Sequence, residues 1–150
     1  MSQTEMPPRL VQFLLGGQAL VVATVDERQA PARTLMTWAV ARNTATLALA
    51  VDTRGRALRN IRANGKVAVE VLGDDLCYGL QGTAVVEKEL MKSPPFPCAL
   101  VAVRVEEVRD HSAAGVRFTG PRYSFHGDKK HRQEVEDAIF AELKGPAPTI

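Results

Sequence analysis

Short runs of apolar and β-branched residues, separated by turn-forming residues, dominate the chain. This pattern predicts strands joined by tight turns, because such runs are typical of sheets. Residues 19–25 are almost wholly apolar, which predicts a strand buried on both faces. Gly79 and Gly82 interrupt a later run, where we expect bulges or close backbone approach. The predicted strands are residues 19–25, 32–41, 45–51, 66–72, 76–86 and 98–108, with weaker signals at 116–118 and 123–125.

Apolar residues at helical spacing occur in three other places. Residues 7–15 begin with prolines, which the first turn of a helix tolerates, and end before a glycine pair. A second short helix is expected after Asp52 and Thr53, which are suitable N-caps, and it stops at Gly65. Residues 129–143 form the third predicted helix.

These elements predict one mainly β domain that spans all 150 residues. Six or so strands joined by short turns, with one helix between the third and fourth, exclude a doubly wound parallel sheet. We expect a small antiparallel β-barrel at about residues 19–126, flanked by helices, because closing a sheet removes its exposed edges. Side chains fill the interior of so small a barrel, so a ligand is expected outside it.

Composition indicates where the protein is expected to work. Hydrophobic residues make up 45% of the chain and charged residues 24%, which predicts a folded core. No apolar stretch approaches the roughly 20 residues of a membrane-spanning helix, and the first residues lack a signal-peptide pattern. The two cysteines have no CxxC spacing. We therefore expect a cytoplasmic protein that has no disulfide framework and no membrane partner.

A local cluster of positive charge stands out against the net charge of +2. Thr53, Arg54 and Arg56 lie where a strand is followed by a helix, and such a place binds phosphate through backbone N–H groups, a hydroxyl and guanidinium groups. The alternative is that the arginines solvate an exposed helix face while Thr53 caps it. Aromatic residues make up 5% of the chain and none lies among these arginines, so nucleic-acid binding is not expected.

Residues 19–86 resemble the split-barrel flavoprotein family related to pyridoxamine 5′-phosphate oxidase. The likeness rests on the order of four segments: ALVVATV, RTLMTW, LALAVDTRGRALRNIRANGKVAVEV and YGLQGTAVV. The resemblance implies an antiparallel split β-barrel of the FMN-binding type, and a homodimer with FMN in a groove at the subunit interface. The deazaflavin F420, or haem as in related split barrels, is the alternative ligand. The phosphate of the cofactor is expected beside the loop after the third strand.

Individual contacts follow from the same resemblance. Arg56 matches the family's basic phosphate contact, and Arg33 matches the basic residue of the second strand. Trp38 is expected to cover a flavin edge, the alternative being a core or dimer-interface anchor. Gln81 and Thr83 are expected to border the ring from either subunit, the alternative being outward residues of a bulge. The expected cofactor-binding residues are Arg33, Trp38, Thr53, Arg54, Arg56, Gln81 and Thr83.

Several positions depart from the family pattern. Gly55, Ala57 and Trp38 stand where the family has a serine and two lysines, and Cys77 replaces a glutamine that contacts the flavin. Pyridoxamine phosphate oxidase activity is therefore not expected. The resemblance implies an FMN-dependent oxidoreductase that transfers hydride or electrons, with its substrate and electron donor unassigned. The alternative is a non-catalytic binding or regulatory module on the same fold.

Other chemistry finds little support in the sequence. The three histidines show no spacing typical of metal ligands, so no metal site is expected. The sequence contains no GxSxG segment and no recognisable nucleophile–base pair, so hydrolysis is not expected. Catalytic residues are not assigned.

Overall fold

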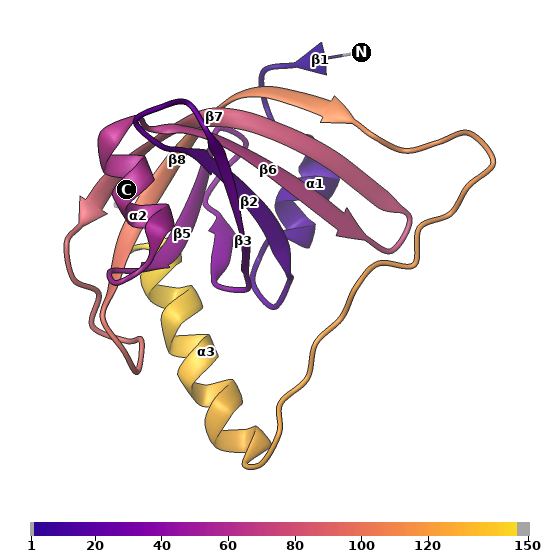
Figure 1. Cartoon of the computed structure of the whole chain (residues 1–150). Helices are drawn as coiled ribbons and strands as arrows, with labels where there is room; N and C mark the ends of the chain where they lie inside the picture. Colours follow the sequence, from indigo (N-terminus) through magenta and orange to yellow (C-terminus); the bar gives the residue numbers. More distant parts are fainter. Residues whose placement is uncertain (1, 147–150) are drawn as a thin grey trace.

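The apolar runs form one curled antiparallel sheet in the computed structural model, which describes residues 2–146 (Figure 1). Along the sheet the strand order is β3-β2-β6-β7-β8-β5-β4, and β1 pairs with β8. The end strands of this path, β3 and β4, follow one another in the chain, so the sheet is a half-barrel split between them. The prediction of a mainly β split barrel with flanking helices is confirmed. The strands are β1 (Ser2–Gln3), β2 (Leu20–Val25), β3 (Pro31–Met36), β4 (Ala39–Ala41), β5 (Thr46–Asp52), β6 (Lys66–Gly73), β7 (Leu76–Lys88) and β8 (Cys98–Asp110).

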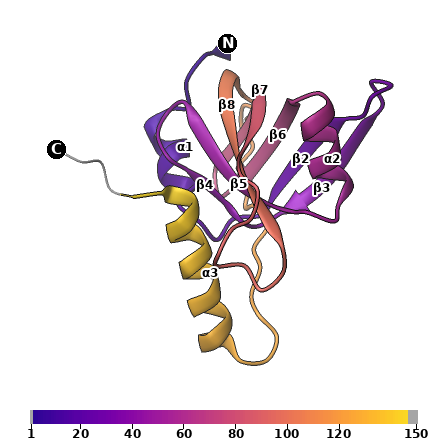
Figure 2. The ribbon, with the colours of Figure 1, turned by 90° about the vertical axis from the view of Figure 1, so that its left-hand side faces the viewer.

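Three helices flank the sheet: α1 (Pro8–Phe13), α2 (Arg56–Ala63) and α3 (Lys129–Lys144). Both α1 and α2 contribute apolar side chains to the same main core. In Figure 2, α1 lies at the left of the half-barrel and α2 at its right. The longer α3 packs Ile139 and Leu143 into a second, smaller core against β4, β5 and the start of β8. None of the helices within residues 2–146 is long and apolar enough to cross a membrane.

The close backbone approach predicted at the glycines of β7 is confirmed, and β6 buries alternate side chains. Val67, Val69 and Val71 are buried in the main core. The ladder between β7 and β8 shifts register between Gln81 and Gly82, which is a bulge. A Cβ atom on Gly82 would overlap the backbone carbonyl of Arg104, so only glycine allows the strands to approach this closely.

Two strand predictions are wrong in detail. The strand at residues 19–25 is not buried on both faces, since Val21 of β2 is 43% exposed on the outer face. The expected strand at 32–41 is divided at Thr37 and Trp38 into β3 and β4. The cause is pairing: β3 pairs with β2, whereas β4 pairs with β5 at the opposite end of the sheet path.

The weak strand signals at residues 116–118 and 123–125 were also misleading, because neither segment is a strand. The connection after β8 runs along the side of the molecule to α3 (Figure 1). Both edges of β8 are already occupied, by β7 on one side and by β5 and β1 on the other. A following segment therefore finds no free edge of β8 with which to pair.

Candidate functional site

A cleft opens where β3, the end of β5, the start of α2 and the loop at residues 89–97 meet. Its volume is about 280 Å³. Three segments that are distant in sequence, residues 34–38, 50–57 and 96–98, form its walls. The lining residues are Thr34, Leu35, Met36, Thr37, Trp38, Ala50, Val51, Asp52, Gly55, Arg56, Ala57, Phe96 and Cys98.

One wall of the cleft is aromatic. The rings of Trp38 and Phe96 stack with their centroids 5.2 Å apart and their planes inclined by 30°. The guanidinium of Arg54 lies 5.3 Å from the centroid of the Phe96 ring, within range of a cation–π interaction. Such a surface can hold a planar aromatic ligand by stacking.

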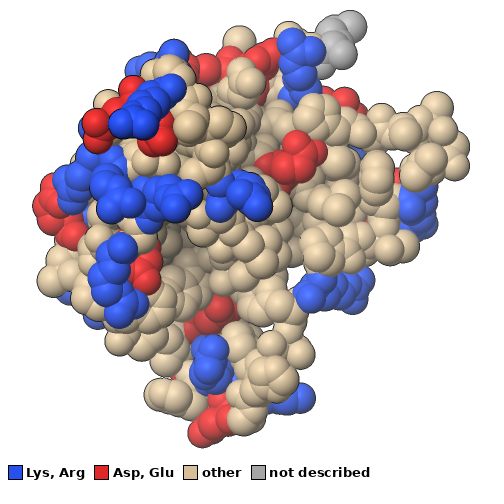
Figure 3. Space-filling model, in the orientation of Figure 1, with Lys and Arg blue, Asp and Glu red and all other residues tan. Residues whose placement is uncertain are grey.

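A second wall of the cleft is suited to an anion. Arg56 is the first residue of α2, and no side chain caps the preceding Gly55, so the first N–H groups of the helix stay free to donate. Arg56 also lines a neighbouring hollow with Arg28 and Arg59. Figure 3 shows Lys and Arg side chains gathered over the region of α2 and the β2–β3 hairpin. Helix N-terminus and arginine together favour a bound phosphate.

Thr53 and Arg54 are engaged within the protein. The Thr53 hydroxyl donates to the carbonyl of Pro97, at 3.3 Å. The Arg54 guanidinium donates to both carboxylate oxygens of Asp52, each at 3.0 Å, and these hydrogen bonds lower the pKa of Asp52. The predicted capping of the helix by Asp52 or Thr53 is wrong, since Gly55 occupies the N-cap position. The reason is that the chain turns for three residues after β5 before α2 begins.

Arg33, Gln81 and Thr83 lie away from the cleft. Arg33 is exposed and pairs with Ala23 of β2, whose neighbours Val22 and Thr24 are buried, so Arg33 lies on the outer face of β3. Gln81 and Thr83 line a different hollow of about 580 Å³ on the outer face of the sheet. There the Thr83 hydroxyl donates to Glu106, at 2.7 Å. A single chain thus brings Trp38 and Arg56 together in the cleft. It leaves Arg33, Gln81 and Thr83 on the outer face of the sheet.

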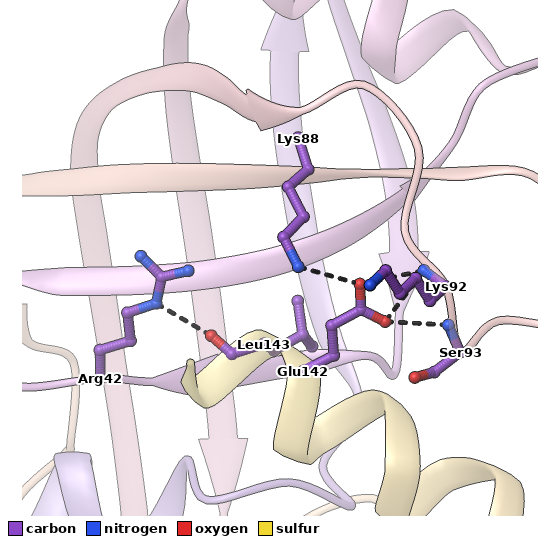
Figure 4. Close-up of polar contacts among 6 residues, drawn as sticks. All are labelled: Arg42, Lys88, Lys92, Ser93, Glu142 and Leu143. Carbon is purple, nitrogen blue, oxygen red and sulfur yellow. Dashed lines mark hydrogen bonds and ion pairs between the residues drawn. The ribbon is translucent and has the colours of Figure 1, made fainter. Parts of the chain in front are cut away.

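Phe96 was missed by the sequence analysis, and its loop is fixed by α3. Glu142 accepts hydrogen bonds from the backbone N–H groups of Lys92 and Ser93 and from the Lys88 ammonium (Figure 4). Burial alone would raise the pKa of Glu142, but these donors lower it to about 2. The proline-rich sequence SPPFP indicated only a break between strands, so no local signal could place the ring in a cleft.

Trp38 is held by a buried carboxylate. Its indole Nε1 donates to Glu136 of α3 at 2.8 Å, and the Tyr123 hydroxyl donates to the other carboxylate oxygen at the same distance. Burial and this contact with Glu136 raise the pKa of Tyr123. The orientation of the indole therefore depends on the C-terminal third of the chain.

No activated nucleophile lines the cleft within the described residues. Cys98 is buried, and desolvation followed by the nearby charge of Asp52 raises the pKa of its thiol to about 11. A thiol with this pKa stays protonated at neutral pH and is a poor nucleophile. The lining of the cleft is suited to binding and orienting a ligand.

Beside the cleft, two side chains of β2 and β3 form an exposed apolar pair. Met36 is buried and Trp38 is half-buried, so they do not form an outward patch. Instead Val21 and Leu35, which lie opposite one another on β2 and β3, are 43% and 67% exposed. This pair lies on the outer face, the same face to which Arg33 points.

Known proteins share this architecture and part of this sequence. The family model described as pyridoxamine 5'-phosphate oxidase matches residues 6–143. The chain belongs to the pyridoxamine 5'-phosphate oxidase family. The match spans the split barrel, the loop at residues 89–97 and most of α3, so all walls of the cleft lie within it. No curated protein sequence matches the chain.

Several solved structures share the fold of this family member at low sequence identity. HupZ from Group A Streptococcus is 20% identical with a TM-score of 0.62, over 79% of this chain and 100% of that chain. An FMN-binding protein from Syntrophomonas wolfei is 14% identical with a TM-score of 0.52, over 69% and 82%. The heme storage protein HutZ from Vibrio cholerae is also 14% identical, with a TM-score of 0.54, over 70% and 94%. At these identities the likeness establishes the fold alone.

Proposed function

We propose that this member of the pyridoxamine 5'-phosphate oxidase family binds FMN in the cleft and acts as an oxidoreductase. The observation that carries the proposal is that one cleft has both an aromatic wall and an anion-binding wall. The stacked Trp38 and Phe96 suit a planar ring, and Arg56 with the uncapped start of α2 suits a phosphate. The name of one structural neighbour, an FMN-binding protein, agrees with this ligand.

FMN supplies hydride or electron transfer when bound, and the protein's own groups supply position and polarity. Arg56 and the first N–H groups of α2 hold the phosphate, which fixes one end of the ligand. The indole of Trp38, oriented by Glu136, borders the ring, and the apolar side chains of the cleft exclude water from it. No general acid or base of the protein is required in this arrangement.

A homodimer that completes the site is part of the proposal. The cleft of about 280 Å³ is slightly smaller than the roughly 300–1,000 Å³ of typical small-molecule pockets. Val21 and Leu35 offer an apolar contact on the outer face, where Arg33 also lies. A second chain is then expected to bring outer-face residues such as Gln81 and Thr83 toward the ligand of its partner.

Trp38 provides a built-in probe, because it is the only tryptophan in the chain. FMN bound beside it should quench its fluorescence in a saturable titration. Arg56→Gln should weaken FMN binding roughly tenfold or more, the loss expected for one charge-assisted phosphate contact of about 1.5–3 kcal/mol. The matched control is Arg62→Gln, which removes the same charge from the last turn of the same helix, outside the cleft.

Equal FMN affinity in the two variants, or no quenching of Trp38, would overturn the proposal. Titration with F420 and with haem tests the two alternative ligands, which stay predictions. A bound flavin that NAD(P)H or another donor cannot reduce would favour the non-catalytic binding module over the oxidoreductase.

The dimer has its own test in solution. Val21→Glu places a charge on the exposed apolar pair, at the member that does not line the cleft, and should shift the molar mass toward that of one chain while weakening FMN binding. Val116→Glu changes a side chain of similar exposure, 52%, in the connection before α3 and should leave both unchanged. A wild-type protein that has the mass of one chain and still binds FMN would contradict a dimer-completed site.

A further inference from the structure

Three potential metal ligands meet on the outer face, outside the cleft. They are Glu70 of β6, Cys77 of β7 and His111, the first residue after β8. Glu70 Oε2 lies 2.8 Å from His111 Nδ1 and 3.4 Å from Cys77 Sγ. All three ligand atoms lie within 4.8 Å of one another. No local spacing in the sequence indicates this group, because its members belong to three separate parts of the chain.

The backbone places these side chains without any flexible segment. Cys77 and Glu70 belong to the tight β6–β7 hairpin, in which Cys77 lies opposite Leu72 and Glu70 opposite Gly79. The N–H of His111 donates to the carbonyl of Cys77 at 2.8 Å, which ties the end of β8 to β7. A Cβ atom on Gly79 would overlap the imidazole of His111, so the glycine makes room for the ring beside Glu70.

The chemistry of the donors restricts the ion. A thiolate, an imidazole and a carboxylate together favour borderline and soft divalent metals over Mg²⁺ or Ca²⁺, which prefer oxygen ligands only. Bond lengths of about 2.0–2.3 Å to zinc place tetrahedral ligand atoms about 3.3–3.6 Å apart. The distance between Cys77 and Glu70 already falls in this range. Glu70 and His111 have side chains that are 44% and 42% exposed, which leaves them room to adjust.

We propose that Glu70, Cys77 and His111 form a binding site for a borderline divalent transition metal, of which Zn²⁺ is the expected occupant. Glu70 and His111 also line a hollow of about 230 Å³ on this face. The fourth ligand position faces this hollow, where a water molecule or other small ligand can reach the metal. Three protein ligands and one open position distinguish such a site from a closed structural zinc site.

Co²⁺ added to metal-free, reduced protein tests the site directly, since a cobalt–thiolate bond gives a near-ultraviolet charge-transfer band. We expect one Co²⁺ per chain with this band, and displacement of the ion by Zn²⁺. Cys77→Ser should abolish the band, while His111→Ala and Glu70→Gln should weaken binding roughly tenfold or more. Cys98→Ser is the matched control, because it removes the other buried cysteine and should leave the band unchanged.

Absence of the band in the wild-type protein, or a band that Cys98→Ser removes and Cys77→Ser retains, would overturn the proposal. His111→Ala alters an exposed ring at the end of a strand, so it keeps the test valid if Cys77→Ser fails to fold. Titration of the same variants with FMN separates this proposal from the flavin site. We expect no loss of FMN affinity in His111→Ala, and Co²⁺ binding without FMN binding would refute the flavin site alone.

Discussion

The two walls of the cleft are held in place by different forces. On one side, α2 buries Leu58 and Ile61 in the main core, at 3% and 4% exposure. On the other side, the loop at residues 89–97 buries Met91, and the carboxylate of Glu142 accepts hydrogen bonds from two of its backbone N–H groups. Apolar packing depends little on pH, whereas a carboxylate clamp is lost when the carboxylate is protonated. The anion-binding wall should therefore be rigid, and the aromatic wall should respond to acid.

The largest expected effect is on the packing of α2, which forms the anion-binding wall. Leu58→Ala leaves a cavity beneath α2 and should lower the free energy of unfolding by about 2–5 kcal/mol. Denaturant unfolding followed by Trp38 fluorescence measures this change. Arg59→Ala, at an exposed position one residue further along, is the control and should change stability by less than about 0.5 kcal/mol. Similar values for the two variants would show that α2 is not held by its apolar face.

The clamp by Glu142 should give the next largest effect, as a dependence on pH. Because its pKa is lowered from 4.5 to about 2 in the folded protein, its stabilisation is fully present above pH 4.5 and disappears as the pH falls toward 2. The contribution is about 2–3 kcal/mol. Glu142→Gln should remove it, so the difference in unfolding free energy between wild type and variant should shrink in acid.

Glu134→Gln is the matched control for this experiment, since it changes an exposed glutamate of the same helix. It should leave the pH profile of the wild type unchanged. A difference between wild type and Glu142→Gln that stays constant from pH 6 to about pH 2 would mean that the clamp does not depend on the charge.

A smaller effect is expected for Glu136, which orients Trp38. Glu136→Gln keeps the shape but replaces a charged acceptor of two hydrogen bonds with an amide, at a cost of about 1–2 kcal/mol. The emission of Trp38 should shift as its indole loses this partner. The pKa of Tyr123 should fall toward its usual value in an absorbance titration, since Glu136 contributes to raising it. An unchanged Trp38 emission would contradict the positioning role.

The smallest effect is expected at the rim between the two walls. Arg62 of α2 pairs with Glu89 at the start of the loop, and their side chains are 47% and 72% exposed. Exposed ion pairs of this kind contribute little to stability, because water and salt screen them. A double-mutant cycle with Arg62→Gln and Glu89→Gln should give a coupling energy smaller than the effect of either preceding variant, and salt should reduce it further. A larger coupling would mean that the rim, and not Glu142, fixes the loop.

Local sequence patterns predicted most of the strands and all three helices, because hydrophobic periodicity is a local signal. They failed where the choice of pairing strand determines whether a segment becomes a strand. Examples are the division of residues 32–41 and the segments at 116–118 and 123–125. At the site, Arg56 and Trp38 line one cleft, whereas Thr53 and Arg54 form hydrogen bonds to Pro97 and Asp52, and their roles in cofactor binding stay predictions. Phe96 had no local signal at all.

The sequence pattern by itself determined most of the strands, the bulge at Gly82 and the position of a basic helix start after a buried strand, because each depends on neighbouring residues. The split-barrel class came from the resemblance to the family. Only the tertiary structure decided which of the charged residues are free and which are paired. It also brought Phe96 beside Trp38, and His111 beside Glu70 and Cys77. Those contacts join residues far apart in the chain, and the physical reason is that the pairing of strands and the docking of α3 fix distances that no local pattern encodes.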